Sequence, residues 1–213
     1  YVYSDLPYFL LKFYLEKKYQ LSLDTQIKNY LYDKIGSTSL TYKPTNFLDK
    51  KLIVPTAVDD YFRFNLVEGH VHDMGAAMMD GISGHAGLFG NSLDIAKILQ
   101  LFLQKGSYAN EKFFDEKFFD LFNFRHFKEK KVRRGIGFDK PELDPDDPNT
   151  CGCASDKSFG HYGFTGSVAW VDPETEIIYV FLSNRTFPDE NNNSLSEFNI
   201  RTEIQKLVHE AFD

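Results

Sequence analysis

The sequence predicts an α+β fold in which helices come first and an antiparallel sheet follows. Apolar residues recur at helical spacing through much of the N-terminal half, and short runs rich in β-branched and aromatic residues follow Lys131. A last helical pattern at the C-terminus would lay its apolar stripe on that sheet. We therefore expect a helical lobe over residues 1–130 and an antiparallel sheet backed by a C-terminal helix over residues 131–213.

Two helices are expected near the N-terminus. Residues 5–19 have apolar residues at helical spacing, with Asp5 as a plausible N-cap and Pro7 tolerated in the first turn. Residues 22–36 repeat the pattern, with Ser22 as the N-cap and a glycine at the end.

The middle of the chain is less regular. Residues 37–80 show no sustained periodicity and carry prolines, which predicts a long irregular segment of the kind that is usually functional in a compact domain. Residues 91–106 form the clearest helical pattern in the chain, with Asn91 or Ser92 as the N-cap. A shorter helix is expected over residues 116–122.

Strands and one more helix are expected after Lys131. The short segment from Asp172 to Glu176 is typical of a hairpin turn, so the last two strands should be antiparallel neighbours. The C-terminal helix is expected over residues 195–212. The strands are expected over residues 133–139, 158–163, 166–172 and 176–184.

Composition excludes some classes of protein. A net charge of −7 argues against nucleic-acid binding, and no apolar run approaches the roughly 20 residues of a membrane helix. The basic cluster Lys128–Arg134 is interpreted as a solvated turn that leads into a strand.

Cys151 and Cys153 match neither a zinc motif nor a C-x-x-C pair, so we interpret them as loop residues and leave a disulfide between them open. The start at Tyr1, without a leader pattern, indicates a piece of a longer protein or a processed product.

Three stretches contain residues that could carry chemistry. In the first, Tyr3 and Asp5 lie just before a helix, where alone they would be explained by packing and capping. The second, residues 69–90, has three histidines, two aspartates and many glycines. His70, His72, Asp73 and His85 suggest a metal site, but their spacing matches no common metal motif. A glycine-pinned loop whose polar side chains satisfy buried backbone groups is the better interpretation, and we expect no metal there.

The third stretch, residues 158–172, carries glycines at positions 160, 163 and 166 within what is otherwise a strand entering a turn. Glycine weakens a strand and supplies no side chain to pack. Either the bends of a hairpin require these glycines, or some group must approach this backbone closely.

Together the three stretches resemble the serine β-lactamase-like hydrolases, which include class C β-lactamases, DD-peptidases and related esterases. In that family a Tyr-x-Asn motif opens a helix of the helical lobe, and a Lys/His-Thr/Ser-Gly motif lies on a strand facing it. Tyr3-Ser4-Asp5 matches the first motif with Asp in place of Asn. His161-Tyr162-Gly163 matches the second with Tyr in place of Thr or Ser.

The resemblance implies roles for these residues. Tyr3 and Asp5 would be catalytic, as would His161, which stands where other members carry lysine and would favour a deprotonated Tyr3. Gly163 would leave room for an acyl group, and the backbone amide of Phe164 would be one of two oxyanion-hole donors. Tyr162 would contact substrate. No cofactor and no metal are implied.

The nucleophile of this family lies in an S-x-x-K motif. No lysine in this chain has a serine three residues before it, and the nearest imitation, Thr25-x-x-Lys28, lies after the tyrosine motif rather than before it. The resemblance therefore implies the C-terminal part of a β-lactamase/transpeptidase-like domain, without the first strands and the nucleophile helix. Alone, this chain is expected to be inactive.

The motifs "VHD", "SGHAGLF" and "FGHYGFTG", collinear to "FNIRTEIQ", resemble one subgroup most closely. It comprises C-terminal domains of two-domain bacterial envelope proteins whose N-terminal half is a family 3 glycoside hydrolase acting on β-N-acetylglucosaminides. Its members imply a small-molecule or peptidoglycan-derived substrate, a glycoside hydrolase domain in the same polypeptide, and a periplasmic or envelope location. The alternative is a non-catalytic module that grips peptidoglycan or supports the glycosidase, suggested by Asp5 and Tyr162, which depart from the usual motifs.

Overall fold

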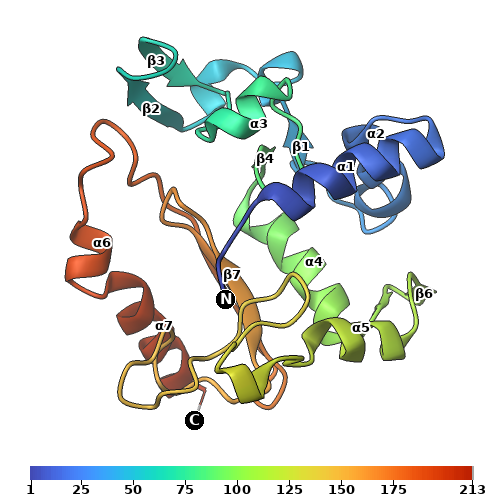
Figure 1. Ribbon diagram of the computed structural model, residues 1–213, viewed down its shortest axis with the longest axis vertical. Coiled ribbons are helices and arrows are strands. Elements are labelled where there is room, and N and C mark those ends of the chain that lie inside the picture. Colours follow the sequence, from blue (N-terminus) through green and yellow to red (C-terminus); the bar gives the residue numbers. More distant parts are fainter. Residues whose placement is uncertain (213) are drawn as a thin grey trace. The chain divides into compact units, whose positions relative to one another are not determined.

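The structure is a computed structural model that describes residues 1–212 (Figure 1). Residue 213, the last of the predicted sheet lobe, lies outside the described residues. The chain forms two compact units, the first comprising residues 1–94 and 184–192 and the second comprising residues 95–183 and those from 193 onward. The assignment of residues 1–130 and 131–213 to two lobes rests on element type and remains a prediction.

The first unit contains short helices and two small antiparallel sheets. Strand β1 pairs with β4, and β2 pairs with β3. The helices are α1 (Leu6–Tyr19), α2 (Leu23–Ile27), the π-helix η1 (Lys28–Tyr32), the 3-10 helices η2 (Pro44–Asn46) and η3 (Lys50–Leu52), and α3 (Met74–Met78). The strands are β1 (Thr41–Tyr42), β2 (Pro55–Asp59), β3 (Asn65–Glu68) and β4 (Leu88–Phe89).

The predicted N-terminal helix is confirmed as α1, but its cap differs from the prediction. Asp5 occupies the N-cap position in a helical conformation, and its side chain makes no capping hydrogen bond. The hydroxyl of Ser4 instead accepts a hydrogen bond from the amide of Leu6 at 3.3 Å. The carboxylate of Asp5 is therefore not used to begin the helix.

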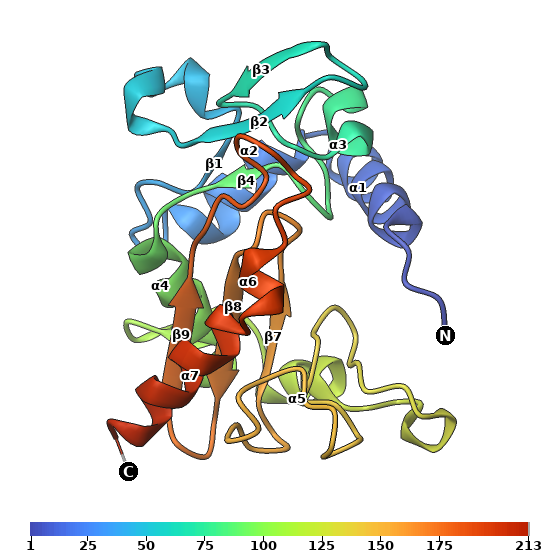
Figure 2. The same ribbon diagram turned by 90° about the vertical axis from the view of Figure 1, so that its left-hand side faces the viewer.

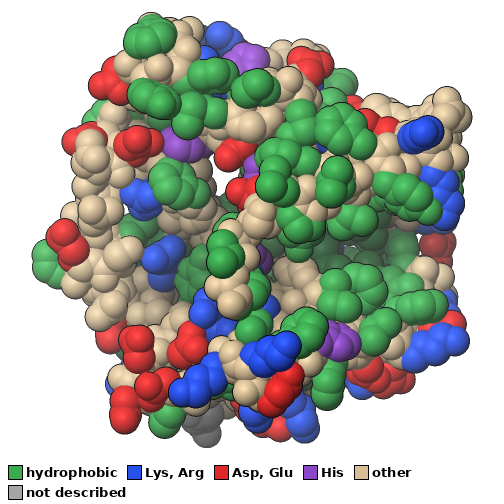
Figure 3. All heavy atoms as spheres, in the orientation of Figure 1, with side chains coloured by type: hydrophobic (Ala, Val, Ile, Leu, Met, Phe, Trp, Pro, Cys, Tyr) green, Lys and Arg blue, Asp and Glu red, His purple; other side chains and the backbone are tan. Residues whose placement is uncertain are grey.

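Helix α1 leaves most of its apolar side chains in solvent. Lys12, which pairs with Glu16 at 2.8 Å, is its one buried residue among those described. Hydrophobic side chains gather over α1 on the face shown in Figure 3. The exposed apolar residues of this helix include Leu6, Leu10, Leu11, Phe13 and Tyr14.

The second predicted helix is confirmed with a change of winding. It begins as α2, widens into the π-helix η1, and stops before Gly36, which has a φ of +66°. Ser22 shares a hydrogen bond with the hydroxyl of Thr25 at 2.9 Å and does not cap a backbone amide.

The prediction of an irregular segment over residues 37–80 is wrong in one respect, because it contains the hairpin β2–β3. Ala57 pairs with Val67 and Asp59 with Asn65 in an antiparallel register. These strands bury few side chains, so the alternation of apolar and polar residues that reveals a half-buried strand is weak.

The turn of this hairpin is organised by the carboxylate of Asp59. Its oxygens accept hydrogen bonds from the amides of Tyr61 at 3.1 Å and Phe62 at 2.8 Å, and from Nε of Arg63 at 2.8 Å. The Phe62 amide, together with the Arg63 guanidinium, holds the pKa of Asp59 well below its usual range. The same guanidinium donates to the carbonyl oxygens of Val71 and His72 at 2.7 and 2.6 Å. Asp59 thereby connects the hairpin to the segment that follows it.

The second unit is built on one three-stranded sheet, with strand order β7-β8-β9 and all pairs antiparallel. Its helices are α4 (Ser92–Leu103), which begins in the first unit, α5 (Glu116–Asn123), the 3-10 helix η4 (Lys128–Lys130), α6 (Ser194–Glu197) and α7 (Ile200–Glu210). Its strands are β5 (Ser107–Tyr108), β6 (Glu111–Lys112), β7 (Phe159–Tyr162), β8 (Val168–Asp172) and β9 (Ile177–Phe181).

The sheet separates two hydrophobic clusters. On one face Phe159 and Val171 pack with Leu99 of α4 and Phe119 of α5. On the other face Trp170 and its neighbours pack against α7, which lies along the sheet in Figure 2. The second cluster contains Val168, Trp170 and Tyr179 with Ile204 and Val208.

The predictions of helices over residues 91–106 and 116–122, of three strands and of a C-terminal helix on the sheet are confirmed. Asn91 caps α4 by accepting from the Asp94 amide at 2.9 Å.

One prediction in this unit is wrong, and another is confirmed only in part. Residues 133–139 form no strand and make only an isolated antiparallel bridge between Asp139 and Gly160. Gly135 lies against the carbonyl of Phe122, where even a Cβ atom would come within 2.3 Å, and the amide of Ile136 donates to that carbonyl at 2.7 Å rather than to a neighbouring strand. The C-terminal helix is also interrupted, because Asn199 adopts a left-handed conformation between α6 and α7.

No helix among residues 1–212 is both long enough and apolar enough to cross a membrane.

The role of Asp59 can be tested by pH. A carboxylate whose pKa is lower in the folded state adds stability above its unfolded pKa of ~4, and this stability is lost as the pH falls. We expect Asp59→Asn to destabilise the protein by about 1 kcal/mol at pH 7. The gap between variant and wild type should narrow as thermal unfolding is followed from pH 5 to pH 2. Asp60→Asn, at the exposed neighbouring position, should change little at any pH. A gap that stays constant with pH would contradict this account.

Candidate active site

The three glycines of residues 158–172 differ in their surroundings and in their backbone conformation. Gly160 lies in β7 opposite Trp170, and a Cβ atom there would come within 2.2 Å of the Ala169 carbonyl oxygen and 2.5 Å of the indole ring. Gly166 has a φ of +96°, which the turn into β8 requires. Gly163 is exposed just past the end of β7, and a Cβ atom there would meet nothing closer than 3.7 Å. Of the three, only Gly163 is exposed, and a Cβ atom there would make ordinary van der Waals contacts.

The backbone around Gly163 forms a tight turn. Its amide donates to the Ser167 carbonyl at 2.8 Å, and its own carbonyl accepts from the Gly166 amide at 2.9 Å. Phe164 follows directly in this turn, and its side chain is 62% exposed. The segment therefore presents backbone, with little side-chain cover, at the end of the strand that carries His161.

The imidazole of His161 is held at both nitrogens. Nδ1 lies 2.7 Å from the carbonyl oxygen of Tyr162, and Nε2 lies 3.0 Å from a guanidinium nitrogen of Arg134. Because a guanidinium only donates, Nε2 accepts and the proton of the neutral ring lies on Nδ1. The positive charge next to this strand therefore belongs to Arg134.

Arg134 is in turn fixed by Asp139, whose side chain is buried. Oδ2 of Asp139 accepts from Arg134 at 3.1 Å, while Arg133 binds both carboxylate oxygens at 2.7 and 2.9 Å. The backbone of Asp139 exchanges two hydrogen bonds with Gly160, at 2.8 and 3.0 Å. One carboxylate thus ties both arginines to the edge of β7.

The prediction that the whole basic cluster Lys128–Arg134 is solvated is wrong for its last two residues. Lys128 to Lys131 are exposed around η4, but Arg133 and Arg134 turn inward to Asp139. Both arginines were missed as site residues, since the carboxylate that recruits them follows in a segment predicted as a strand. The basic pair followed by an aspartate was the available signal.

Tyr162 points away from His161. Alternation along β7 places its ring on the α7 face, where it packs against Trp170 with a centroid distance of 5.6 Å. Its hydroxyl donates to the carbonyl of Asn149, and burial raises its pKa to about 12. The hydroxyl is engaged within the fold, and contact of Tyr162 with substrate remains a prediction.

Tyr3 and Asp5 belong to the first unit, at the start of α1. The side chain of Tyr3 is 53% exposed, and the backbone carbonyl of Asp5 accepts from the amides of Tyr8 and Phe9 at 2.9 and 3.3 Å. His161, Tyr162, Gly163 and Phe164 belong to the second unit. That Tyr3 and His161 share one cleft remains a prediction.

The histidine-rich segment 69–90 packs under α1. Phe9 of α1 contacts the ring of His85 with a centroid distance of 4.7 Å, and a Cβ atom at Gly84 would come within 2.8 Å of the Tyr8 carbonyl. Nε2 of His85 lies 2.9 Å from Oδ1 of Asp73, which also caps α3 through the Ala76 amide at 2.6 Å. This agrees with the prediction of a glycine-pinned loop whose polar side chains serve the backbone.

The histidines of this segment have separate surroundings. His85 bonds to Asp73, His72 lies 3.0 Å from Glu190, and His70 lines a surface pocket. Among residues 1–212, the one group of three potential metal ligands lies elsewhere, at Cys151, Cys153 and His209.

Ser83, His85 and Asp73 form a hydrogen-bonded row that has the composition of a catalytic triad. The hydroxyl of Ser83 lies 2.9 Å from Nδ1 of His85. However, Ser83 is only 1% exposed, and its carbonyl accepts a hydrogen bond from the hydroxyl of Tyr42 at 3.0 Å. A nucleophile must reach a carbonyl carbon of the substrate, so this serine cannot serve as one in the folded chain.

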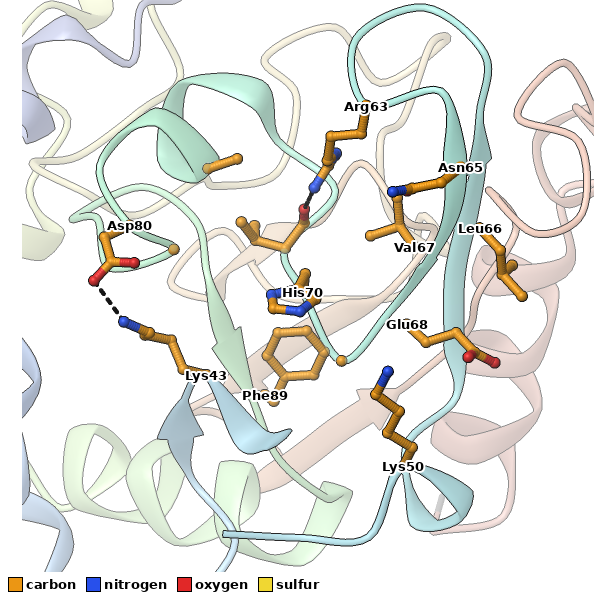
Figure 4. Close-up of a pocket in the computed structure, with 14 residues that line it drawn as sticks. Lys43, Lys50, Arg63, Asn65, Leu66, Val67, Glu68, His70, Asp80 and Phe89 are labelled. Carbon is orange, nitrogen blue, oxygen red and sulfur yellow. Dashed lines mark hydrogen bonds and ion pairs between the residues drawn. The ribbon is translucent and has the colours of Figure 1, made fainter. Parts of the chain in front are cut away.

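A pocket of about 440 Å³ lies in the first unit between η3, the β2–β3 hairpin and α3 (Figure 4). Lys43 pairs with Asp80 on its wall, while Lys50 points into the pocket in the close-up. No serine or cysteine lines it, and neither Tyr3 nor Asp5 does. The pocket is therefore not the predicted site of acyl transfer.

Comparison with known proteins identifies the family. The family described as Beta-lactamase matches residues 1–201. The chain belongs to the beta-lactamase family. Its fold agrees, because a beta-lactamase from Mycobacterium bovis superposes with a TM-score of 0.66 at 15% identity, covering 99% of this chain and 64% of that one. A penicillin-binding protein homologue from Caulobacter crescentus gives a TM-score of 0.54 at 14% identity, covering 79% of this chain and 48% of that one. The predicted β-lactamase/transpeptidase-like α+β fold is confirmed.

Two curated relatives have higher sequence identity to this chain than the solved structures do. An N-acetylmuramyl-L-alanine amidase of Bacillus subtilis is 32% identical over 209 residues, covering 90% of this chain and 47% of the relative. A putative D-alanyl-D-alanine carboxypeptidase of Salmonella agona is 30% identical over 201 residues, covering 86% of this chain and 45% of the relative. The chain spans about half the length of the curated relatives it matches.

The glycines of β7 provide a matched pair of variants. We expect Gly160→Ala to destabilise the protein by at least about 2 kcal/mol, because the new Cβ overlaps backbone that cannot move without disrupting the sheet. Gly163→Ala should stay within about 0.5 kcal/mol of wild type, because its Cβ would make only ordinary van der Waals contacts, the nearest at 3.7 Å. Denaturant unfolding measures both. Equal destabilisation of the two variants would show that Gly163 is also needed for packing.

The ion-pair network predicts a large effect at Asp139. Asp139→Asn would leave two half-buried arginines without their shared carboxylate, so we expect a loss of about 3–5 kcal/mol. Asp147→Asn, at an exposed position in the following loop, should be neutral. Near-wild-type unfolding of Asp139→Asn would contradict the assignment of this carboxylate as the anchor of the site.

Proposed function

We propose that this chain is the C-terminal part of a serine acyl hydrolase that cleaves amide or ester bonds of small or peptidoglycan-derived substrates. The observation that carries the proposal is the family match over residues 1–201, which includes both the tyrosine motif at Tyr3 and the strand of His161. Members of this family are serine hydrolases. The exposure of the backbone at Gly163 supports an acyl-binding role for this strand.

The nucleophile in this proposal is a serine of an S-x-x-K motif upstream of Tyr1. The chain has no such motif, and the burial of Ser83 removes the serine with the most suggestive neighbours. The exposed apolar side chains of α1 support the presence of further chain that covers this helix in the intact protein.

In the proposed mechanism the upstream serine attacks the substrate carbonyl carbon and passes its proton to Tyr3, assisted by the upstream lysine. The amide of Phe164 donates to the developing oxyanion, an interaction typically worth about 3 kcal/mol in the transition state. A free phenol titrates near ~10, so Tyr3 needs nearby positive charge to act as a base at neutral pH. The Arg134 guanidinium, bonded to His161 of β7, is the cation next to that strand. The proton then passes to the leaving group, and water releases the acyl group in a second transfer.

The names of the relatives suggest which bond of the substrate is cleaved. An N-acetylmuramyl-L-alanine amidase and a putative D-alanyl-D-alanine carboxypeptidase are both named for amide bonds that involve alanine. We therefore place an amide of a peptidoglycan-derived peptide first among substrates, ahead of β-lactams and simple esters. The corresponding location is the cell envelope, and an N-terminal family 3 glycoside hydrolase in the same polypeptide is the proposed partner domain.

A non-catalytic module that binds peptidoglycan or supports the glycosidase is the second candidate. Asp5 and Tyr162 both depart from the family motifs, and the hydroxyl of Tyr162 is bonded to Asn149 rather than open to substrate. In such a module the fold would be retained without acyl transfer.

Covalent labelling distinguishes these proposals. We expect a fluorophosphonate probe and labelled penicillin to leave the 213-residue chain unmodified, because no activated hydroxyl is available. The protein that includes the upstream segment should be labelled at its S-x-x-K serine. In that protein Tyr3→Phe should slow acylation at least tenfold with unchanged unfolding, since it removes a proton carrier and little volume.

Peptide mass spectrometry locates any label. Modification of the 213-residue chain on one of its own serines, abolished by Ser83→Ala for instance, would overturn the proposed position of the nucleophile. A longer protein that lacks S-x-x-K and takes no label would favour the non-catalytic module.

A further inference from the structure

A cysteine pair and a histidine meet where the loop after residue 141 reaches helix α7. Cys151 and Cys153 are joined by a disulfide, and the amide of Cys151 donates to Oε1 of Gln205 at 3.1 Å. His209 follows one turn after Gln205 on the same helix, so both side chains face this loop. The two sulfur atoms and a ring nitrogen of His209 all lie within 4.8 Å of one another.

Two polar side chains of α7, Gln205 and His209, are buried beside the cysteine loop. Gln205 is 1% exposed, and its Nε2 has no hydrogen-bond partner among residues 1–212. The amide cannot simply be turned over, because its oxygen accepts from Cys151. His209, on the same face of α7, is 3% exposed. Buried polar groups without partners are costly, and the Gln205 NH2 group is an unused donor beside the cysteine loop that does not itself coordinate a metal ion.

We propose that reduction of the disulfide creates a metal-binding site formed by Cys151, Cys153 and His209, with zinc as the ion to test. Two thiolates and one imidazole are suitable ligands for zinc and leave its fourth tetrahedral position open. Zn–S and Zn–N bonds of about 2.3 and 2.0 Å require donors roughly 3.5 Å apart. The two sulfur atoms, which a disulfide holds about 2 Å apart, therefore have to separate by about 1.5 Å, and Cys153 lies on an exposed loop that can supply this movement.

Reduction of the Cys151–Cys153 disulfide is a two-electron step. Two molecules of a thiol reductant supply two electrons and two protons, the S–S bond breaks into two cysteine thiols, and the reductant leaves as its own disulfide. Zinc then displaces both thiol protons, so two thiolates neutralise its charge while His209 binds as neutral imidazole. With the disulfide formed, neither sulfur is a thiolate and the site is lost. This inference does not depend on the proposed hydrolase function, since the cluster shares no residue with Tyr3, His161 or Gly163.

Zinc titration of the 213-residue chain tests the proposal. After reduction with a phosphine that is then removed, the chain should take up one zinc ion from a chromophoric indicator, and the oxidised chain should take up none. Cobalt(II) should give the sulfur-to-metal absorption band of thiolate coordination in the reduced chain only. Cys153→Ser, a change at an exposed position, should weaken zinc binding at least tenfold.

The histidine is tested separately. His209→Ala should weaken zinc binding at least tenfold, whereas His126→Ala, which removes a ring bonded to the Leu121 carbonyl in another part of the unit, should not. Circular dichroism checks that the variants are folded, and Cys153→Ser keeps the proposal testable if His209→Ala is not. Equal zinc binding by the reduced and oxidised chains would overturn the proposal, as would unchanged affinity in Cys153→Ser.

Discussion

The site in the second unit depends on the ion pairs of the buried Asp139 carboxylate with two arginines. Asp139 binds Arg133 and Arg134 with its side chain, and its backbone exchanges two hydrogen bonds with Gly160 in β7. Burying a carboxylate is costly unless cations and hydrogen bonds surround it, and here they come from the two arginines and the amide of Lys140. The result is a cation held next to His161 on the edge of the sheet.

The regular parts of the fold were predictable because they follow local rules. Helix α4 combines helical spacing with a capping Asn91, and the hairpin after Asp172 has the expected turn chemistry. The parts that were missed depend on distant partners. The strand predicted over residues 133–139 does not form because its arginines are drawn to Asp139, and the strand β2 was hidden because it buries few side chains.

The candidate site was predictable only as far as its motifs. The family resemblance located His161 and Gly163, and the exposure of Gly163 agrees with the role it implies. Periodicity could not show that His161 is neutral and that Arg134 carries the charge, because this follows from hydrogen bonds made in three dimensions. Likewise, the proximity of His209 to the cysteine loop arises from packing of segments more than fifty residues apart, for which the sequence offers no pattern.

The central claim is that Tyr3 and the strand of His161 serve one acyl-transfer site in the intact protein. An experimental structure of the longer protein with a phosphonate bonded to its S-x-x-K serine tests it most directly. The account predicts a phosphonate oxygen within hydrogen-bond distance of the Phe164 amide, with the Tyr3 hydroxyl beside the serine and Arg134 close by. A phosphonate oxygen bound elsewhere, or Tyr3 on a different surface from His161, would contradict the account.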